Sequence, residues 1–289
     1  LFIGASLSAA TASVMAGANV AEASATKPQK WDKTVNVVII GSGGAGLATA
    51  VSAAENGVKD ILVLEKLAFL GGNTAIATGA FNTADPKQKE QGIEDSPELH
   101  AQQTLKGGDF RANPELVNEL SHNSYDTLTW LESKGVKFQP KILQVYGALW
   151  PRSHATAASK GSDYIRVLSE EAKKLGVTIQ TQAKVVDIIR ENQLSGRALG
   201  VEYLNKDGQH VFVRALKAVV ACPGGFGANR EMRSLHDPRL YNLTTTNNPA
   251  ASTGEVLVMM QDIGADVTGM DHILSLIHIS EPTRLRRIS

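Results

Sequence analysis

The sequence is poor in cysteine and carries no excess of charge of either sign. Cys222 is the only cysteine among 289 residues, which excludes internal disulfides and cysteine-rich zinc, iron–sulfur or haem-attachment sites. The 29 Lys and Arg residues balance 29 Asp and Glu residues, and a neutral chain lacks the basic surface that nucleic acid binding requires. No cluster of His, Asp and Glu has metal-ligand spacing, so we predict no metal site. With 43% hydrophobic residues, the composition is that of a globular protein.

A long hydrophobic run is also missing. Residues 1–21 contain no charge, yet Gly, Ser, Thr and Asn interrupt them too often for a stable membrane span. The stretch ends in Ala23, Ser24 and Ala25, a small-x-small pattern typical of signal-peptidase cleavage. We interpret residues 1–25 as the remnant of an export signal that lacks its charged start; a disordered alanine-rich leader is the alternative. Its weak hydrophobicity resembles that of twin-arginine signals, which predicts a periplasmic protein.

The other end of the chain has an unusual composition. Residues 274–284, LSLIHISEPTR, resemble a translated sequencing-library adapter, so we expect residues 274–289 to be a non-native tail. The folded body then comprises residues 26–273, and we expect the natural protein to continue past Ile273.

A nucleotide-binding pattern opens the folded body. Residues 35–40 form a short, β-branched, apolar run typical of a buried parallel strand. The motif Gly-x-Gly-x-x-Gly follows at residues 41–46, and an amphipathic segment then runs to Gly57. A second apolar strand, residues 60–65, ends in Glu65, which lies 19 residues after Gly46. Strand, glycines, helix, strand and acid together predict a dinucleotide site.

Each part of this motif has a mechanical purpose. Gly41 allows a tight turn, Gly43 lets the backbone approach a pyrophosphate, and Gly46 lets helix and strand pack closely. The helix N-terminus presents free N–H groups to phosphates. Glu65 is placed to accept the ribose hydroxyls and to repel a 2′-phosphate. The motif does not choose between FAD and NAD.

The next residues carry a resemblance to a known family. Residues 70–74, LGGNT, and 78–82, TGAFN, resemble the flavin-binding stretch of the fumarate reductase and succinate dehydrogenase flavoproteins. Over residues 35–273 the sequence resembles the soluble periplasmic flavocytochrome c-type fumarate reductases and the urocanate reductases of this family. The resemblance implies FAD as cofactor. Combined with the glycine motif, it predicts cofactor contacts at Gly41, Gly43, Gly44, Ala45, Gly46, Glu65, Lys66, Gly72, Asn73, Thr74, Thr78, Gly79, Val185 (through its backbone, to adenine) and Gly224.

The remaining pattern predicts an α/β fold: a parallel-sheet FAD-binding domain of the glutathione-reductase type with a β-meander crossover. After a helix over residues 162–175, residues 177–181 form the third parallel strand. We predict the meander from strands at residues 186–190, 198–204 and 211–213, followed by the next parallel strand, residues 218–222. That strand leads to Gly224, where Cys222-Pro223 replaces the Ala-Thr usual in the family.

Between these strands the sequence predicts a helical excursion. Helices over residues 96–107 and 113–135 are expected to pack on the flavin domain, the second capped by Asn113 and followed at its first turn by Pro114. Arg152 and His154 belong to a segment that lies near the flavin in the family; we favour an exposed loop, with contact to substrate or FAD as the alternative. His100, His122 and His210 are expected in amphipathic or surface positions. Thr253 is a possible N-cap of a last helix.

The resemblance also implies an activity. Family members transfer a hydride from flavin N5 to the C=C bond of an α,β-unsaturated carboxylate, and the residues that bind substrate and donate the proton lie in a capping domain. We expect that domain to be missing here, so we assign no catalytic residue and expect the fragment to be inactive alone. Electrons would come from a separate cytochrome, a further flavin domain or a soluble donor. Alternatives are another flavoenzyme of this fold, such as a 3-ketosteroid dehydrogenase or an aspartate oxidase, a non-catalytic FAD module and, least favoured, an NAD-linked dehydrogenase.

Overall fold

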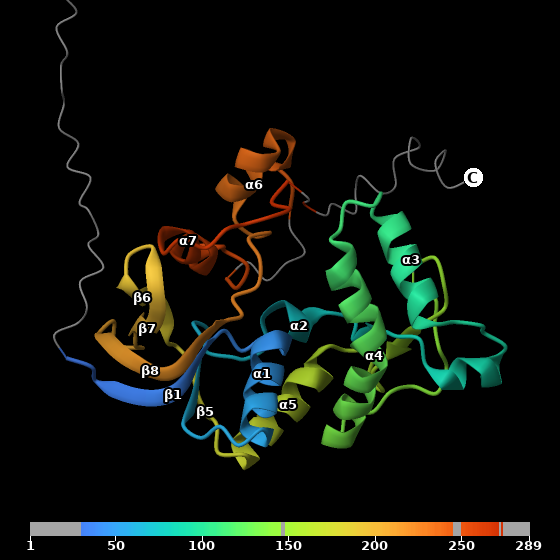
Figure 1. Cartoon of the computed structure of the whole chain (residues 1–289), viewed down its shortest axis with the longest axis horizontal. Helices are drawn as coiled ribbons and strands as arrows, with labels where there is room; N and C mark the ends of the chain where they lie inside the picture. Colours follow the sequence, from blue (N-terminus) through green and yellow to red (C-terminus); the bar gives the residue numbers. More distant parts are fainter. Residues whose placement is uncertain (1–29, 146–147, 245–249, 272, 274–289) are drawn as a thin grey trace, which may run out of the picture.

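A mixed six-stranded sheet lies at the left of Figure 1. The computed structural model describes residues 30–145, 148–244, 250–271 and 273. The strand order is β5-β2-β1-β8-β7-β6, and the strands β5, β2, β1 and β8 run parallel while β8, β7 and β6 pair antiparallel. The strands are β1 (Lys33–Ile40), β2 (Ile61–Leu64), β5 (Thr178–Gln180), β6 (Lys184–Asn192), β7 (Ser195–Leu204) and β8 (His210–Ala221). The predicted α/β fold with a mostly parallel FAD-type sheet is therefore confirmed.

The core has two parts, one on each face of the sheet, and the side chains of β1 contribute alternately to both. Val37 and Ile39 pack toward α1 (Gly44–Glu55) and α5 (Ser162–Lys174), together with Leu47 and Leu168. Successive strand residues point to opposite faces, so Val38 and Ile40 instead join β6, β7 and the partly buried side chains of α7 (Glu255–Asp262). Because both faces are covered, β1 and β2 are apolar throughout their buried parts rather than alternating.

One strand differs from the sequence expectation. The predicted strands at residues 211–213 and 218–222 form a single strand, β8, that pairs with β7 in its first half and with β1 along most of its length. The β1 register moves from Val35–Ala215 to Val37–Ala218, so a bulge on β8 absorbs the extra residue. The two predicted strands left residues 214–217 unassigned, whereas in the structure one strand with a bulge continues through them.

The helical excursion lies beside the sheet, at the green end of Figure 1. Helix α4 starts where Asn113 Oδ1 accepts hydrogen bonds from the N–H groups of its first turn, and it is followed by Gly135 at φ 104°. Glu55 on α1 accepts a hydrogen bond from Trp130 Nε1 at 2.9 Å and forms an ion pair with Lys134. These two contacts attach α4 to α1. The elements of this part are α2 (Gly72–Ile76), β3 (Ala80–Asn82), the 3₁₀ helix η1 (Pro86–Gln91), α3 (Pro97–Gly107), α4 (Pro114–Lys134) and β4 (Ser153–Ala155).

The last described elements lie above the sheet, as Figure 1 shows in orange and red. They are α6 (Arg230–His236), the 3₁₀ helix η2 (Pro238–Leu240) and α7. The predicted cap of α7 is wrong: Gly254, at φ 76°, occupies the N-cap position, because the backbone enters the helix in a left-handed conformation that Thr253 avoids. No helix in the described part of the chain has the length and apolar character to cross a membrane.

Candidate functional site

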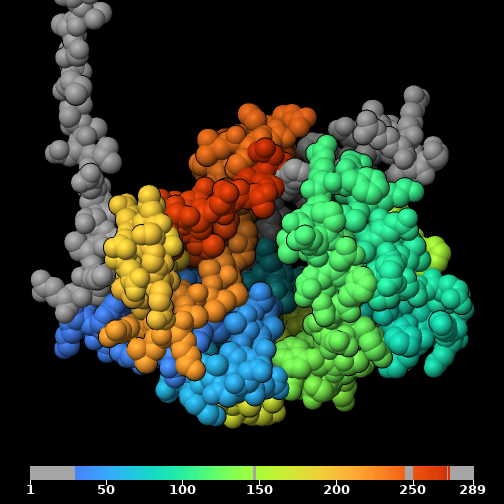
Figure 2. All heavy atoms as spheres, viewed as in Figure 1, coloured from blue at the N-terminus to red at the C-terminus, as the bar shows by residue number. Residues whose placement is uncertain are grey.

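A cleft of about 390 Å³ lies at the carboxyl ends of β1, β2 and β8. In open α/β sheets this edge is where ligands bind. The molecule is hollowed between the orange-red α6–α7 region and the green α3–α4 helices, with teal residues at the back (Figure 2). The predicted cofactor residues that line the cleft are Gly41, Gly43, Gly44, Ala45, Glu65, Lys66, Gly72, Asn73, Thr74, Val185 and Gly224.

The glycines of the first turn separate into two kinds. A Cβ on Gly46 would lie 1.9 Å from the carbonyl oxygen of Gly41, and a Cβ on Gly41 would lie 2.4 Å from that of Cys222. These two glycines are required by the packing of the protein itself. Gly43 differs, because the atom nearest to its Cβ would be Gly71 O at 3.9 Å. The free space at Gly43 therefore opens onto the cleft, where a ligand can approach the backbone.

The N-terminus of α1 offers amide groups to this space. Gly44 N–H donates to Thr74 Oγ1 at 3.1 Å. Within the described residues, the N–H groups of Gly43 and Ala45 donate no hydrogen bond. Amides without a protein partner at a helix N-terminus attract an anion through their partial positive charge. The chemistry of this turn therefore fits a diphosphate, as the sequence predicts.

Glu65 is buried at the end of β2, with 7% of its surface exposed. Its Oε2 accepts hydrogen bonds from Ser42 N at 3.0 Å and Ser42 Oγ at 2.6 Å, and its Oε1 accepts one from Leu67 N at 2.9 Å. A carboxylate has about four acceptor positions, so it can still accept from a ligand hydroxyl. Sequence reasoning missed Ser42, although a hydroxyl residue between the first two glycines could have indicated a contact with the acid.

The segment around α2 forms a further wall of the cleft. Asn73 Nδ2 donates to Ser252 Oγ at 2.7 Å, which joins α2 to the residues that precede α7. Gly72 lies close to the same segment, because its Cβ would be 4.0 Å from the Ala251 side chain. Residues 247–255 resemble the family's flavin-side loop and helix start, and residues 247–249 of this stretch lie outside the described residues.

Three predicted contacts do not line the cleft, namely Gly46, Thr78 and Gly79. Gly46 is buried in α1. Thr78 is exposed, whereas Gly79 is buried, accepts a hydrogen bond from the Tyr164 hydroxyl at 2.9 Å and faces Thr156. Burial and the neighbouring Asp163 raise the pKa of Tyr164, which keeps this hydroxyl a donor. In this structure Gly79 is therefore a packing position beside α5.

An ion-pair cluster at the cleft was also missed by the sequence analysis, apart from Lys66. Lys66 Nζ donates to Glu255 Oε2 at 2.9 Å and to Thr253 Oγ1 at 2.6 Å, and Lys184 Nζ lies 2.8 Å from Glu255 Oε1. Partial burial would raise the pKa of Glu255, but hydrogen bonds from Lys184, Lys66 and Thr253 lower it to about 2. Glu255 is therefore a carboxylate at neutral pH.

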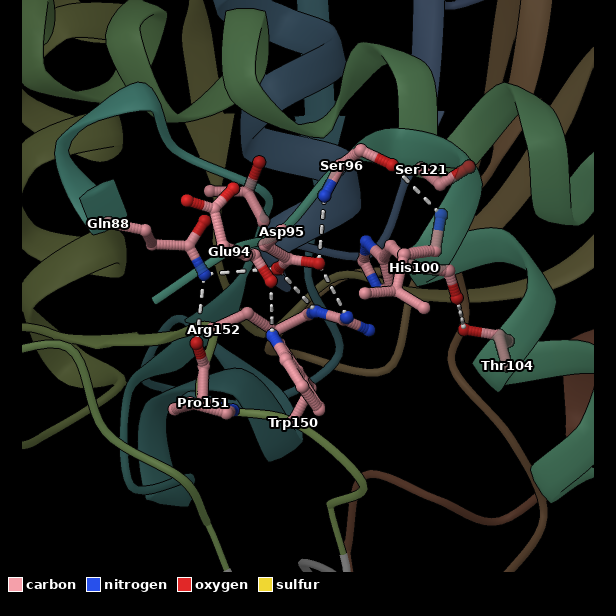
Figure 3. Close-up of polar contacts among 12 residues, drawn as sticks. Gln88, Glu94, Asp95, Ser96, His100, Thr104, Ser121, Trp150, Pro151 and Arg152 are labelled. Atoms are coloured by element: carbon pink, nitrogen blue, oxygen red, sulfur yellow. Dashed lines mark hydrogen bonds and ion pairs between the residues drawn. The ribbon is translucent and has the colours of Figure 1, made fainter. Parts of the chain in front are cut away.

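The expectation of an exposed loop at Arg152 and His154 is wrong. Both residues are buried, at 6% and 4% exposure. Arg152 forms a two-point ion pair with Asp95, through Nε at 2.9 Å and Nη2 at 2.8 Å (Figure 3). His154 Nε2 lies 3.2 Å from Asp85 Oδ2. Burial is possible because acids from the preceding segment reach these side chains, which the sequence order alone does not reveal.

His100, His122 and His210 do not line the cleft. His100 is buried rather than at the surface, beside Arg152 in Figure 3, and burial and the positive charge of Arg152 lower its pKa. His122 and His210 are exposed and lie near Glu98 and Glu202 respectively. In the described ranges, no three His, Cys, Asp or Glu side chains gather closely enough to hold a metal ion.

The fold and the cleft together define a dinucleotide-binding flavoprotein domain. Residues 36–286 match the model of the FAD binding domain family, and the chain belongs to this family. FAD is its cofactor, as predicted.

Three known proteins illustrate the relationship. The acrylate reductase flavoprotein subunit of Shewanella woodyi is 33% identical over 93% of this chain and 54% of its own length. The open conformation of a flavocytochrome c3 fumarate reductase has a TM-score of 0.76 and 29% identity over 82% of this chain and 41% of its own. A 3-ketosteroid-Δ4-(5α)-dehydrogenase of Rhodococcus jostii has a TM-score of 0.78 and 29% identity over 86% of this chain and 57% of its own. The chain spans about half the length of the curated relatives it matches.

Proposed function

We propose that this chain is the FAD-binding half of a reductase that acts on the C=C bond of an α,β-unsaturated carboxylate. The observation that carries the proposal is the cleft, in which the unpartnered amides of α1 and the buried carboxylate of Glu65 lie at the ends of adjacent strands. These groups match the diphosphate and the ribose of an adenine dinucleotide. The acrylate and fumarate reductases among the relatives support the substrate class.

The residues of this chain hold and orient the cofactor in the proposal. The N–H groups of Gly43 and Ala45 donate hydrogen bonds to the diphosphate, and the Glu65 carboxylate accepts hydrogen bonds from the ribose hydroxyls. Val185 meets the adenine through its backbone, and Asn73 and Thr74 supply short polar groups toward the flavin. Once reduced by the electron donor, bound FAD would supply the hydride, from N5 to one alkene carbon, and an acid would supply the proton to the other. We place that acid in the half of the protein that follows residue 273.

Electron supply and location complete the proposal. A relative named as a flavoprotein subunit and others named as cytochrome or NADH-linked reductases support a separate cytochrome or flavin electron donor. The weak signal-like pattern of residues 1–25 supports export to the periplasm, through the twin-arginine route that carries folded proteins.

The first test is cofactor retention by the whole chain. The purified protein, mixed with FAD and separated from excess by gel filtration, is expected to remain yellow. A folded, colourless protein that retains NAD instead would contradict the proposal. The substrate class is tested on the full-length gene product, by following oxidation of the reduced flavin with acrylate, fumarate or urocanate.

Replacing Glu65 with alanine is expected to weaken FAD binding about tenfold or more, because the ribose hydroxyls lose a charged acceptor. The affinity is measured by titration, alongside the thermal midpoint of the cofactor-free chain. Glu65→Gln keeps the size of the side chain and one acceptor oxygen, so its loss of affinity should be smaller. Unchanged FAD affinity in Glu65→Ala would refute the role given to this residue.

A second candidate is a 3-ketosteroid dehydrogenase, favoured by the similarity to the Rhodococcus structure. It would use the same FAD half and a different second half. An aromatic, apolar sequence after residue 273 and flavin reduction by a 3-ketosteroid would favour it, whereas reoxidation by an unsaturated carboxylate favours the first candidate. If the complete gene product binds FAD but reacts with neither class, a non-catalytic FAD module becomes the better description.

A further inference from the structure

The ion-pair cluster around Glu255 joins three separate parts of the cleft. Lys66 follows β2, Lys184 begins β6, and Glu255 begins α7; all three line the cleft. Lys66 Nζ lies 2.9 Å from Glu255 Oε2, and Lys184 Nζ lies 2.8 Å from Glu255 Oε1. Thr253 adds a hydroxyl that accepts from Lys66 and donates to Glu255 Oε2 at 2.8 Å. The cluster therefore connects the start of α7 to the end of β2 and the start of β6.

Outside the cluster, the α7 segment is held by partly buried side chains, by Ser252 and by polar contacts at its ends. None of the α7 side chains is buried, although Val256 and Met259 pack partly against the sheet. At its far end, the carbonyl oxygen of Ile263 accepts a hydrogen bond from Arg190 Nη1. At its near end, Asn229 Nδ2 donates to Thr253 O at 2.9 Å. Because no side chain of α7 is fully buried, polar contacts such as these add to the packing that holds the helix in position.

Residues 251–256 form one wall of the cleft. The cluster meets the cleft beside Glu65 and Val185, the positions proposed for ribose and adenine. Movement of α7 away from β2 and β6 would therefore open the adenosine end of the cleft, and it requires both lysines to leave Glu255.

We propose that the Lys66–Glu255–Lys184 cluster is a latch that holds α7 over the adenosine end of the cleft and thereby slows the release of FAD. The proposal rests on the proposed function, because it assigns a retention role to residues of the same site. Glu255 acts as a positioning residue: its contacts are to the two lysines and to Thr253. The lysine heads are partly exposed, so salt should weaken the latch.

The test is the rate at which the loaded chain releases FAD, followed by the rise in flavin fluorescence after dilution. Glu255→Gln keeps the size of the side chain and removes its charge, and we expect release about fivefold faster. Raising the salt from about 0.1 M to about 1 M shortens the screening length from about 10 Å to about 3 Å. Salt should speed release from the unaltered chain and change the Glu255→Gln rate much less.

Two further variants make the test decisive. Lys184→Met removes one arm of the latch and should give a smaller acceleration, about twofold. Glu170→Gln is the control and should leave release unchanged, because Glu170 pairs with Arg166 on the exposed side of α5 and does not line the cleft. If Glu255→Gln releases FAD at the unaltered rate, or more slowly because the freed lysines attract the diphosphate, the latch is refuted.

Hydrogen exchange of the cofactor-free chain separates this proposal from the proposed function. Glu255→Gln should raise exchange at the α7 amides while leaving β1 and α1 unchanged, and equal exchange at α7 would overturn the latch. Failure of the unaltered chain to bind FAD would instead overturn the proposed function.

Discussion

Replacing Asp95 with asparagine is expected to lower the free energy of unfolding by about 3–5 kcal/mol, which is a large fraction of the stability of a typical domain. The Asp95 side chain is fully buried, and that of Arg152 is 7% exposed. Asp95 also accepts hydrogen bonds from Gln88 Nε2 at 3.0 Å and Ser96 N at 3.0 Å. The substitution would leave the Arg152 guanidinium buried without a counter-charge, and desolvation of that charge is the reason for the loss.

The measurement is urea unfolding of single and double variants. Asp207→Asn makes the same chemical change in an exposed turn and should change stability by less than about 0.5 kcal/mol. Asp95→Leu combined with Arg152→Met removes both charges and should recover much of the loss, because no unpaired charge remains. A stability of Asp95→Asn close to that of the unaltered chain would show that Arg152 finds another partner.

Replacing Gly46 with alanine is the second large effect, at about 3 kcal/mol of lost stability. Its Cβ would lie 1.9 Å from Gly41 O, a backbone atom that cannot move without displacing the turn and β1. Because the displaced amides can no longer bind the diphosphate, the affinity of the chain for FAD should also fall. Thermal or urea unfolding and an FAD titration measure the two effects.

The matched substitution Gly43→Ala should separate stability from binding. Its Cβ meets nothing closer than 3.9 Å, and Gly43 already has a φ of −67° that alanine adopts. The cost in stability should be at most about 1 kcal/mol, the usual cost at a helix N-cap. FAD affinity should nevertheless fall about tenfold or more, because the methyl group occupies the approach to the diphosphate. Equal loss of stability in both variants would contradict the division of roles.

Much of the nucleotide-binding half could be predicted because its signals are local. The buried strand β1, the glycine turn, helix α1 and strand β2 lie in one continuous stretch, and each has its own chemical signature. Asn113 and Gly135 likewise mark the ends of α4, since a capping side chain and a left-handed glycine act within one helical turn. The bulge in β8 was missed, because a polar interruption of an apolar pattern does not distinguish a turn from a bulge.

Local sequence signals were enough to predict the parallel βαβ unit with its glycine turn and the acid after its second strand, because glycine geometry and strand burial are properties of neighbouring residues. The burial of Arg152 against Asp95, 57 positions away, and the contact of Lys66 with Glu255, 189 positions away, depend on tertiary packing. An arginine or a lysine in a loop sequence is equally compatible with solvent and with an ion pair. The oppositely charged partner comes from an element distant in the sequence, and its approach leaves no periodic or local signal in the chain.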